Sequence, residues 1–289
     1  MKATGAVQPF LPFCRRLLPD RLAGLSVALL KATALDLAIL VGHLFLYPSG
    51  IFEERRDPDP APAVPDGTTT PLPARPRPPV VLLHGFIDNR SVFFFLRRTL
   101  AQHGGRHIVC LNYSPLTWDI RGAAEQLGKH IAEICEHTGS DRVDIVGHSL
   151  GGLIARYYVQ RLGGDHRVRT LVTLGTPHAG TRALPLADAH PIVRQMRPGS
   201  DLLKELEMPA PDCRTRFVSF WSDLDHLMDP LESAGIDHPD LLVQNVQVTG
   251  IGHLALPVHP AVATGIRQAL DAEETAAGAT PRRNGLTVA

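Results

Sequence analysis

A serine suited to nucleophilic chemistry lies in the pentapeptide Gly147-His148-Ser149-Leu150-Gly151, directly behind the apolar run 143–146. A Gly-x-Ser-x-Gly turn between a buried strand and a helix lifts the serine hydroxyl clear of the sheet. The two outer glycines leave room for the turn, because a Cβ at either one would crowd the strand or the helix. Apolar side chains then recur at helical spacing from Leu150 to Tyr158. The context therefore predicts a strand, a nucleophile turn and a helix.

Two side chains later in the chain are candidates to activate this serine. A serine hydroxyl is a weak nucleophile at neutral pH unless a base takes its proton and a third group orients that base. His253 follows the last predicted strand, and Asp225 follows the strand before it. Strand ends of this kind meet at the carboxyl edge of an open α/β sheet, where catalytic groups gather. We therefore expect Ser149, Asp225 and His253 to act as nucleophile, acid and base. Asp223 is an alternative acid, and either aspartate could instead cap the next turn.

Acyl chemistry also needs hydrogen-bond donors for the oxyanion of the tetrahedral intermediate. The backbone N–H of Leu150, immediately after the serine, is the first candidate. The second is the N–H of Phe86, in the segment His84-Gly85-Phe86 that follows the apolar run 80–83. Gly85 permits the turn, and we expect His84 to brace this loop by hydrogen bonding.

Elements able to position these groups alternate along residues 80–272. Short apolar runs typical of doubly buried strands alternate with segments of helical periodicity. The predicted strands are 80–83, 107–113, 143–146, 168–174, 217–221 and 243–248, with helices at 91–103, 120–134 and 260–270. Alternation of this kind predicts an α/β fold, with a mostly parallel sheet of about six strands flanked by helices.

Five motifs together resemble the bacterial triacylglycerol lipase/esterase branch of the α/β-hydrolases, in particular the compact class 2 lipases. They are Leu83-His84-Gly85-Phe86, Gly147-His148-Ser149-Leu150-Gly151-Gly152, Leu174-Gly175-Thr176-Pro177-His178, Trp221-Ser222-Asp223-Leu224-Asp225 and Gly250-Ile251-Gly252-His253. The resemblance covers about residues 80–270. It implies an α/β-hydrolase fold, the triad Ser149, Asp225 and His253, and an oxyanion hole formed by Phe86 and Leu150. The N-terminal region departs from the pattern of a simple secreted lipase.

An insertion at about 181–213 precedes the fifth predicted strand. Its apolar anchors are Ile192, Met196, Leu202, Leu203, Leu206 and Met208. We expect a small helical cap that forms part of the acyl pocket, and a packed crossover helix is the alternative. We expect His178, just before this insertion, to have a structural role because the triad already contains its base.

The N-terminal region divides into two parts by composition. Residues 1–52 are basic at first and then apolar from 22 to 46, with Lys31 and Asp36 as interruptions. Residues 53–79 form a Pro-rich linker with an extended character. The apolar part is long enough to span a bilayer, but each charge near the centre costs roughly 2.5–3.5 kcal/mol. A membrane anchor, a helix lying on a membrane surface and a helix packed on the hydrolase all remain open. We expect a membrane or cell-envelope location, with a secreted or cytoplasmic protein as the alternative, and a flexible tail at 273–289.

Composition excludes some partners and leaves other questions open. The chain has 29 basic and 29 acidic residues and no basic block, so nucleic acid is not an expected partner. The acidic residues Asp229, Asp237 and Asp240 lack the ligand spacing of a known calcium loop, and we expect no metal site there. The four cysteines form no C-x-x-C pair, so cysteine spacing determines neither the redox compartment nor a disulfide. Oligomeric state is also open.

These patterns predict a serine carboxylester hydrolase that cleaves acyl esters or lipids through an acyl-enzyme on Ser149, with no cofactor. An acyltransferase or amidase is the alternative within enzymes, because the triad does not choose the acceptor. A membrane-tethered binding protein on a hydrolase fold is the alternative from another class.

Overall fold

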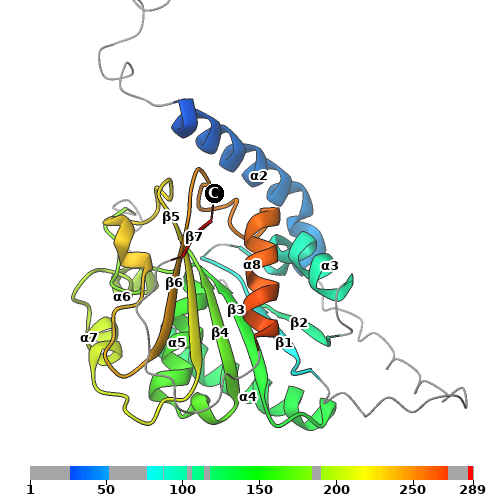
Figure 1. Cartoon of the computed structure of the whole chain (residues 1–289), viewed down its shortest axis with the longest axis vertical. Coiled ribbons are helices and arrows are strands. Elements are labelled where there is room, and N and C mark those ends of the chain that lie inside the picture. The colour runs from blue at the N-terminus through cyan, green and yellow to red at the C-terminus, as the bar shows by residue number, and fades with distance from the viewer. Residues whose placement is uncertain are drawn as a thin grey trace, which may run out of the picture.

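A single parallel β-sheet forms the centre of the computed structural model, which describes residues 27–51, 77–86, 88–102, 106–113, 118–183, 190–272 and 286–288. Its strand order is β2-β1-β3-β4-β5-β6-β7 (Figure 1). The strands are β1 (Val80–Leu83), β2 (Ile108–Leu111), β3 (Val143–His148), β4 (Val168–Leu174), β5 (Arg216–Ser222), β6 (Leu242–Val248) and β7 (Leu286–Val288). All neighbouring strands pair in parallel. The six predicted strands are present, and the predicted α/β fold is confirmed.

Helices cover both faces of the sheet. On one face lie α4 (Ile120–Thr138) and α5 (Leu150–Arg161), and on the other lie α3 (Phe94–Gln102) and α8 (Pro260–Asp271). The short 3₁₀ helix η1 (Arg90–Phe93) leads into α3. The buried residues of α4 and α8 recur at helical spacing, so each of these helices turns one apolar stripe to the sheet, whereas α5 is buried on almost all sides.

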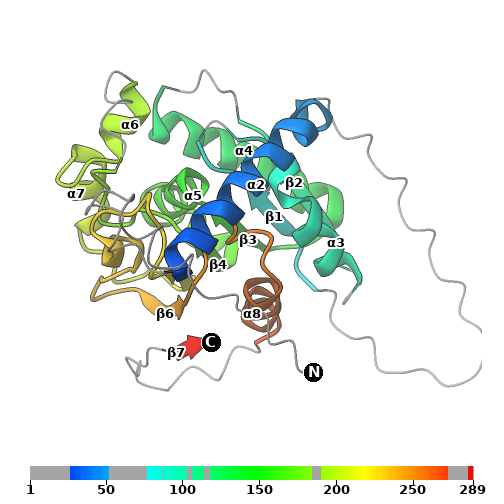
Figure 2. The ribbon, with the colours of Figure 1, turned by 90° about the horizontal axis from the view of Figure 1, so that it is seen from above.

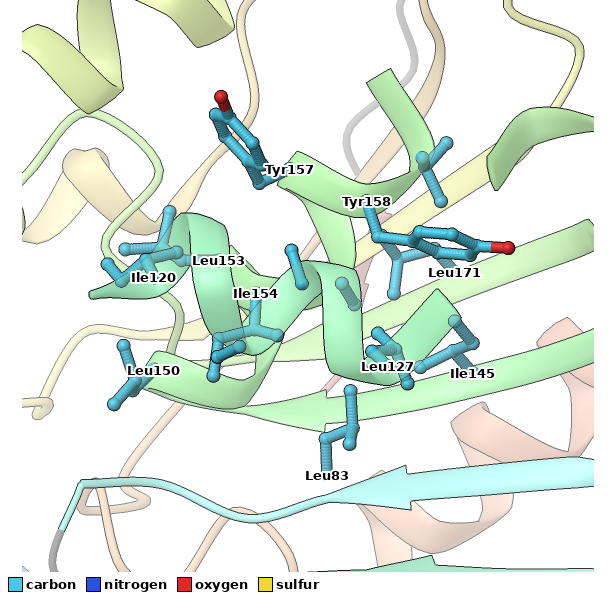
Figure 3. Close-up of a cluster of buried hydrophobic side chains, with 14 of the residues drawn as sticks. Leu83, Ile120, Leu127, Ile145, Leu150, Leu153, Ile154, Tyr157, Tyr158 and Leu171 are labelled. Carbon is cyan, nitrogen blue, oxygen red and sulfur yellow. The ribbon is translucent and has the colours of Figure 1, made fainter. Parts of the chain in front are cut away.

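The larger of two apolar clusters lies between the sheet and the pair α4–α5 (Figure 3). Leu83 and Ile145 point into it from the sheet, while Leu127 on α4 and Ile154 on α5 meet them from the helices. These four side chains are 0–3 % exposed. Since α5 starts one residue after Ser149, this packing fixes the direction in which the nucleophile turn leaves the sheet.

The end of the chain corrects one prediction. Residues 286–288 were expected in a flexible tail, but they form β7 and pair with Val246, Gln247 and Val248 of β6. Leu286, Thr287 and Val288 favour extended structure, and without them β6 would present an open edge of unpaired backbone groups. The polar, Gly/Ala-rich composition around this short segment obscured the strand. Residues 273–285 lie outside the described part of the chain.

The predicted insertion contains two short helices, α6 (Pro191–Gln195) and α7 (Asp201–Glu207). Five of its six predicted apolar anchors are buried, and these are Ile192, Met196, Leu202, Leu203 and Leu206. Met208 was wrongly included, because it is 54 % exposed. The chain becomes extended at Met208, where α7 ends, and this directs the side chain to solvent.

Helix α2 (Val27–Ile51) lies across the carboxyl edge of the sheet, as Figures 1 and 2 show from two directions. It packs mainly on η1, and Ile39 joins the apolar cluster on the α3–α8 face. In the described ranges, no helix is both long and apolar enough to cross a membrane. Helix α2 is thus packed on the α/β domain, which is one of the three arrangements considered for this segment. Most of the predicted linker, residues 53–76, lies outside the described residues.

Candidate active site

Ser149 occupies a strained turn between β3 and α5. Its φ of 52° and ψ of −121° make it the one non-glycine residue with positive φ in the described part of the chain. A Cβ on Gly147 would lie 2.6 Å from the backbone N of Gly152, and one on Gly151 would overlap the carbonyl oxygen of Leu83. The motif therefore needs its glycines for space. A backbone strain of this size, about 1–3 kcal/mol, persists where surrounding packing enforces it, and it is typical of functional sites.

The acid and the base predicted from sequence lie together. Nδ1 of His253 is 2.8 Å from Oδ2 of Asp225, and both residues are almost completely buried. Asp223 does not contact the imidazole ring; its Oδ1 accepts the N–H of Gly250 at 2.8 Å. Asp225 is therefore the hydrogen-bond partner of the imidazole, and Asp223 holds the start of the loop that carries His253.

Opposing effects act on the pKa of His253. Burial lowers the pKa, but the carboxylate of Asp225 raises it through charge and a hydrogen bond, and Asp36 and Asp88 raise it further. The net effect is a pKa above the usual value of 6.5. An imidazole in this setting is a stronger base, and its charged form is stabilised after it takes a proton.

The loop after β1 passes directly beside the serine. A Cβ on Gly85 would lie 3.2 Å from Cβ of Ser149, so the backbone at this position approaches the nucleophile closely. His84 donates from Nδ1 to the carbonyl of Gly85 at 2.9 Å, and its ring stacks on Tyr113 with centroids 4.1 Å apart. Burial lowers the pKa of His84 to about 4, which keeps the ring neutral. His84 therefore braces the loop, as expected, and Phe86 is placed beside the pocket that contains Ser149.

The loop after β4 packs against the acid–base pair. Gly175 has a φ of 52°, and a Cβ there would lie 2.7 Å from Oδ2 of Asp225. Thr176 donates its hydroxyl hydrogen to the carbonyl of Ser149 at 2.9 Å. His178 points away from this chemistry: its Nε2 is 2.9 Å from Oγ1 of Thr173, and it is buried. The structural role expected for His178 agrees with this position.

A cavity of about 170 Å³ connects Ser149 with His253. Ser149 and His253 both line it, together with Phe86 and with Thr181 and Met196 of the insertion. The insertion therefore contributes to the walls of the pocket. A larger cavity of about 400 Å³ lies between α4 and the ends of β1 and β2, and it contains neither Ser149 nor His253.

Sequence reasoning missed two residues of the pocket. Asp88 lies four residues after His84, and burial raises its pKa to about 6, with His253 acting in the opposite direction. His148, inside the serine motif, donates from Nε2 to the carbonyl of His253 at 3.2 Å. Both could have been found from their position in the sequence, because Asp88 closely follows the His84-Gly85 turn and His148 directly precedes Ser149.

Metal ligands and disulfides play no visible part in the described residues. In those ranges, no cluster of three or more His, Cys, Asp or Glu side chains is arranged to hold a metal ion. Cys110, Cys135 and Cys213 are free thiols, and Cys14 lies outside the described residues.

Comparisons with known proteins agree with this architecture. A family model described as the alpha/beta hydrolase fold matches residues 78–200. The mature lipase BlEst2 of Bacillus licheniformis superposes with a TM-score of 0.58 at 18 % identity, covering 71 % of this chain and 96 % of that one. Lipase B of Aspergillus fumigatus gives a TM-score of 0.61 at 17 % identity, covering 68 % and 53 %. The sheet topology, the family model and these structures together show that the chain has the α/β-hydrolase fold.

Within that class, the sequence is similar to bacterial triacylglycerol lipases. One from Pseudarthrobacter phenanthrenivorans is 32 % identical over 116 residues, which are 37 % of this chain and 35 % of the relative. One from Burkholderia plantarii is 32 % identical over 116 residues, covering 37 % and 32 %. The chain thus spans about a third of the length of these relatives.

Proposed function

We propose that the protein is a serine carboxylester hydrolase that acts on acyl esters. The observation that carries this proposal is the strained Ser149 in one pocket with His253, whose Nδ1 is 2.8 Å from the buried Asp225. The lipase names of the sequence relatives support the same reaction class.

In the proposed mechanism, Nε2 of His253 takes the proton of Ser149 while Oγ attacks the ester carbonyl carbon. Asp225 holds the imidazole in the correct tautomer and stabilises its charged form. The N–H groups of Phe86 and Leu150 bind the oxyanion, and each such donor is worth about 3–4 kcal/mol of barrier. His253 then protonates the leaving alcohol, and a water molecule activated by the same base releases the acyl group. The chemistry requires no cofactor.

Hydrolysis of p-nitrophenyl esters of graded acyl length tests this proposal. The cavity of about 170 Å³ is smaller than the about 300–1,000 Å³ of typical drug-sized sites, so butyrate should react at least about tenfold faster than palmitate. Ser149→Ala should abolish the reaction and also labelling by a fluorophosphonate. A folded wild-type protein that neither hydrolyses any ester nor takes up the label would reject the proposal. Preferential acyl transfer to an added alcohol or amine would instead indicate an acyltransferase.

A second proposal concerns where the enzyme works: α2 rests on a lipid surface. Its outward face is apolar, with Leu30, Leu35, Leu37, Leu40, Val41, Phe45 and Leu46 all 36–82 % exposed. Its one acidic residue, Asp36, is turned inward, so the outer face carries no negative charge. Arg15, Arg16 and Arg21 precede it in the sequence and would attract anionic headgroups. An apolar helix face with basic residues nearby is typical of helices that lie in the membrane interface.

Co-sedimentation with phosphatidylglycerol vesicles tests this placement. Leu37→Glu combined with Phe45→Glu should remove most of the bound fraction, while Met208→Glu, a single change of the same kind at an exposed site outside α2, should not. Equal binding of both variants and the wild type would reject α2 as the contact surface.

A further inference from the structure

Asp36 is the only acidic residue of α2, and it faces the protein. Leu35 and Leu37 on either side are 44 % and 60 % exposed, whereas Asp36 is less exposed than either. The other charged residue of the helix, Lys31, is exposed. Burial raises the pKa of Asp36, which shows that this orientation carries a desolvation cost. The charge of His253 and a hydrogen bond from the backbone of Ala255 lower the pKa and so offset part of this cost.

Those partners flank His253 in the loop between β6 and α8. Oδ1 of Asp36 accepts the backbone N–H of Ala255 at 3.1 Å. Its Oδ2 occupies the space where a Cβ on Gly252 would project. The carboxylate therefore contacts the residue before His253 and a residue just after it. The carboxylate fits at this place because Gly252 has no Cβ.

Other contacts hold the same loop from the opposite end. Asp223 binds the N–H of Gly250, and the hydroxyl of Ser222 donates to the carbonyl of Ile251. His148 donates to the carbonyl of His253 itself. Asp36 adds a restraint at Ala255, beyond His253, and it comes from a helix 219 residues earlier in the sequence.

The charge of Asp36 also acts on the imidazole. The groups that face His253 are the carboxylates of Asp225, Asp88 and Asp36 and the ring of His148, whose centroid is 4.7 Å from that of His253. His226 lies near enough to interact with Asp36. All three carboxylates raise the pKa of His253 against the effect of burial.

We propose that Asp36 is a positioning residue, through which α2 holds the loop of His253 in its working geometry and stabilises the imidazolium that forms during the reaction. This inference rests on the proposed function and deepens it. It also links α2, whose outer face we propose to rest on lipid, to the proposed catalytic base. The packing of α2 on the domain and the alignment of His253 then depend on the same contact, that of Asp36 with the loop.

The test is a set of variants in the full chain, assayed with p-nitrophenyl butyrate over a range of pH. Asp36→Ala removes both the acceptor and the charge, and kcat should fall about tenfold with KM changed less than about twofold, because small misplacements of catalytic groups are costly. Asp36→Asn keeps an acceptor for Ala255. Its kcat at the alkaline plateau should stay within about twofold of the wild type, while the acid limb moves down by about 0.5 pH unit. Lys31→Gln, on the exposed face of the same helix, should change neither quantity.

A double-mutant cycle checks the contact itself. Gly252→Ala places a methyl group where the carboxylate lies, and it should lower kcat much as Asp36→Ala does. In the Asp36→Ala background the same change should cost less than about twofold, since the clash is gone. The proposal would be overturned if the losses in kcat of Gly252→Ala and Asp36→Ala simply added in the double variant and the pH profile of Asp36→Ala were the same as that of the wild type. Circular dichroism of every variant distinguishes these effects from unfolding.

Direct titration of His253 by NMR separates this proposal from the proposed function. The imidazole pKa should be lower in Asp36→Asn than in the wild type, whether or not any ester is hydrolysed. An inactive wild-type protein with this shift would reject the esterase function and retain the role of Asp36 toward the His253 loop. An unchanged pKa would overturn the electrostatic role of Asp36 even in an active enzyme.

Discussion

Oδ2 of Asp225 lies 2.8 Å from Nδ1 of His253, and neither side chain has appreciable contact with solvent. Asp223, only two residues earlier, is turned to the backbone of Gly250 instead. The two aspartates that follow β5 thus have different partners. The strand ends at Ser222 and a turn begins there, so side chains two residues apart no longer point in the same direction.

Replacement of these two aspartates should have very different effects. Asp225→Asn should lower kcat by about 10³–10⁴-fold, because the amide can hold the imidazole in the wrong tautomer and no longer stabilises its charge. Asp223→Asn is the matched control, and it should cost about tenfold or less, since it weakens one backbone hydrogen bond of the loop. Steady-state kinetics with one soluble ester measure both. A larger loss in Asp223→Asn would mean that the acid has been wrongly assigned.

Substitution of the nucleophile should separate activity from stability. Ser149→Ala should lower kcat by about 10⁴–10⁶-fold, while keeping the strained φ of 52°. Ser149→Gly should be equally inactive but more stable than Ser149→Ala by about 1 kcal/mol, because glycine adopts positive φ without a Cβ penalty. Urea unfolding of the two variants measures the difference. Equal or reversed stabilities would show that the turn is not strained in solution.

The acid limb of kcat/KM should report His253. The proposed base works only when neutral, and its pKa is raised above 6.5 because the surrounding carboxylates outweigh the effect of burial. Activity should therefore fall about tenfold per pH unit below a midpoint above 6.5. A pH profile at constant ionic strength checks this. A midpoint well below 6.5 would indicate that burial, rather than the carboxylates, dominates at this site.

Asp88 should make folding stability depend on pH in the direction opposite to a salt-bridged carboxylate. Its folded pKa of about 6 exceeds the usual 3.8 because burial disfavours the charge, so it destabilises the folded state above pH 6 and stops doing so as pH falls toward 4. Asp88→Asn should raise the free energy of unfolding by up to about 3 kcal/mol at pH 7 and by little at pH 4. Asp201→Asn, at an exposed site, is the control. A gain that does not shrink on acidification would contradict the assigned cause.

Local sequence determined the parts of this protein that depend on local backbone geometry. A Gly-x-Ser-x-Gly behind an apolar run has few ways to fold, so Ser149, the strand before it and α5 were all predictable. Apolar runs and helical periodicity likewise indicated the six longer strands and the α/β class. The placement of Asp225 and His253 behind successive strands brought them to one edge of the sheet by topology alone. The short strand β7 was not predicted, because three residues are too few to show the periodicity by which a strand is recognised.

Tertiary structure decided what depends on direction and on distant contacts. Which of Asp225 and Asp223 is hydrogen-bonded to the imidazole depends on the direction of each side chain, and the spacing of the two residues in the sequence does not determine that direction. In the sequence, Asp36 is a charged interruption of an apolar segment. Only the folded chain shows that it contacts the loop that carries His253. The physical reason is that sequence patterns record the local preferences of the backbone and of burial, whereas hydrogen bonds and charges between distant segments arise only once packing has brought those segments together.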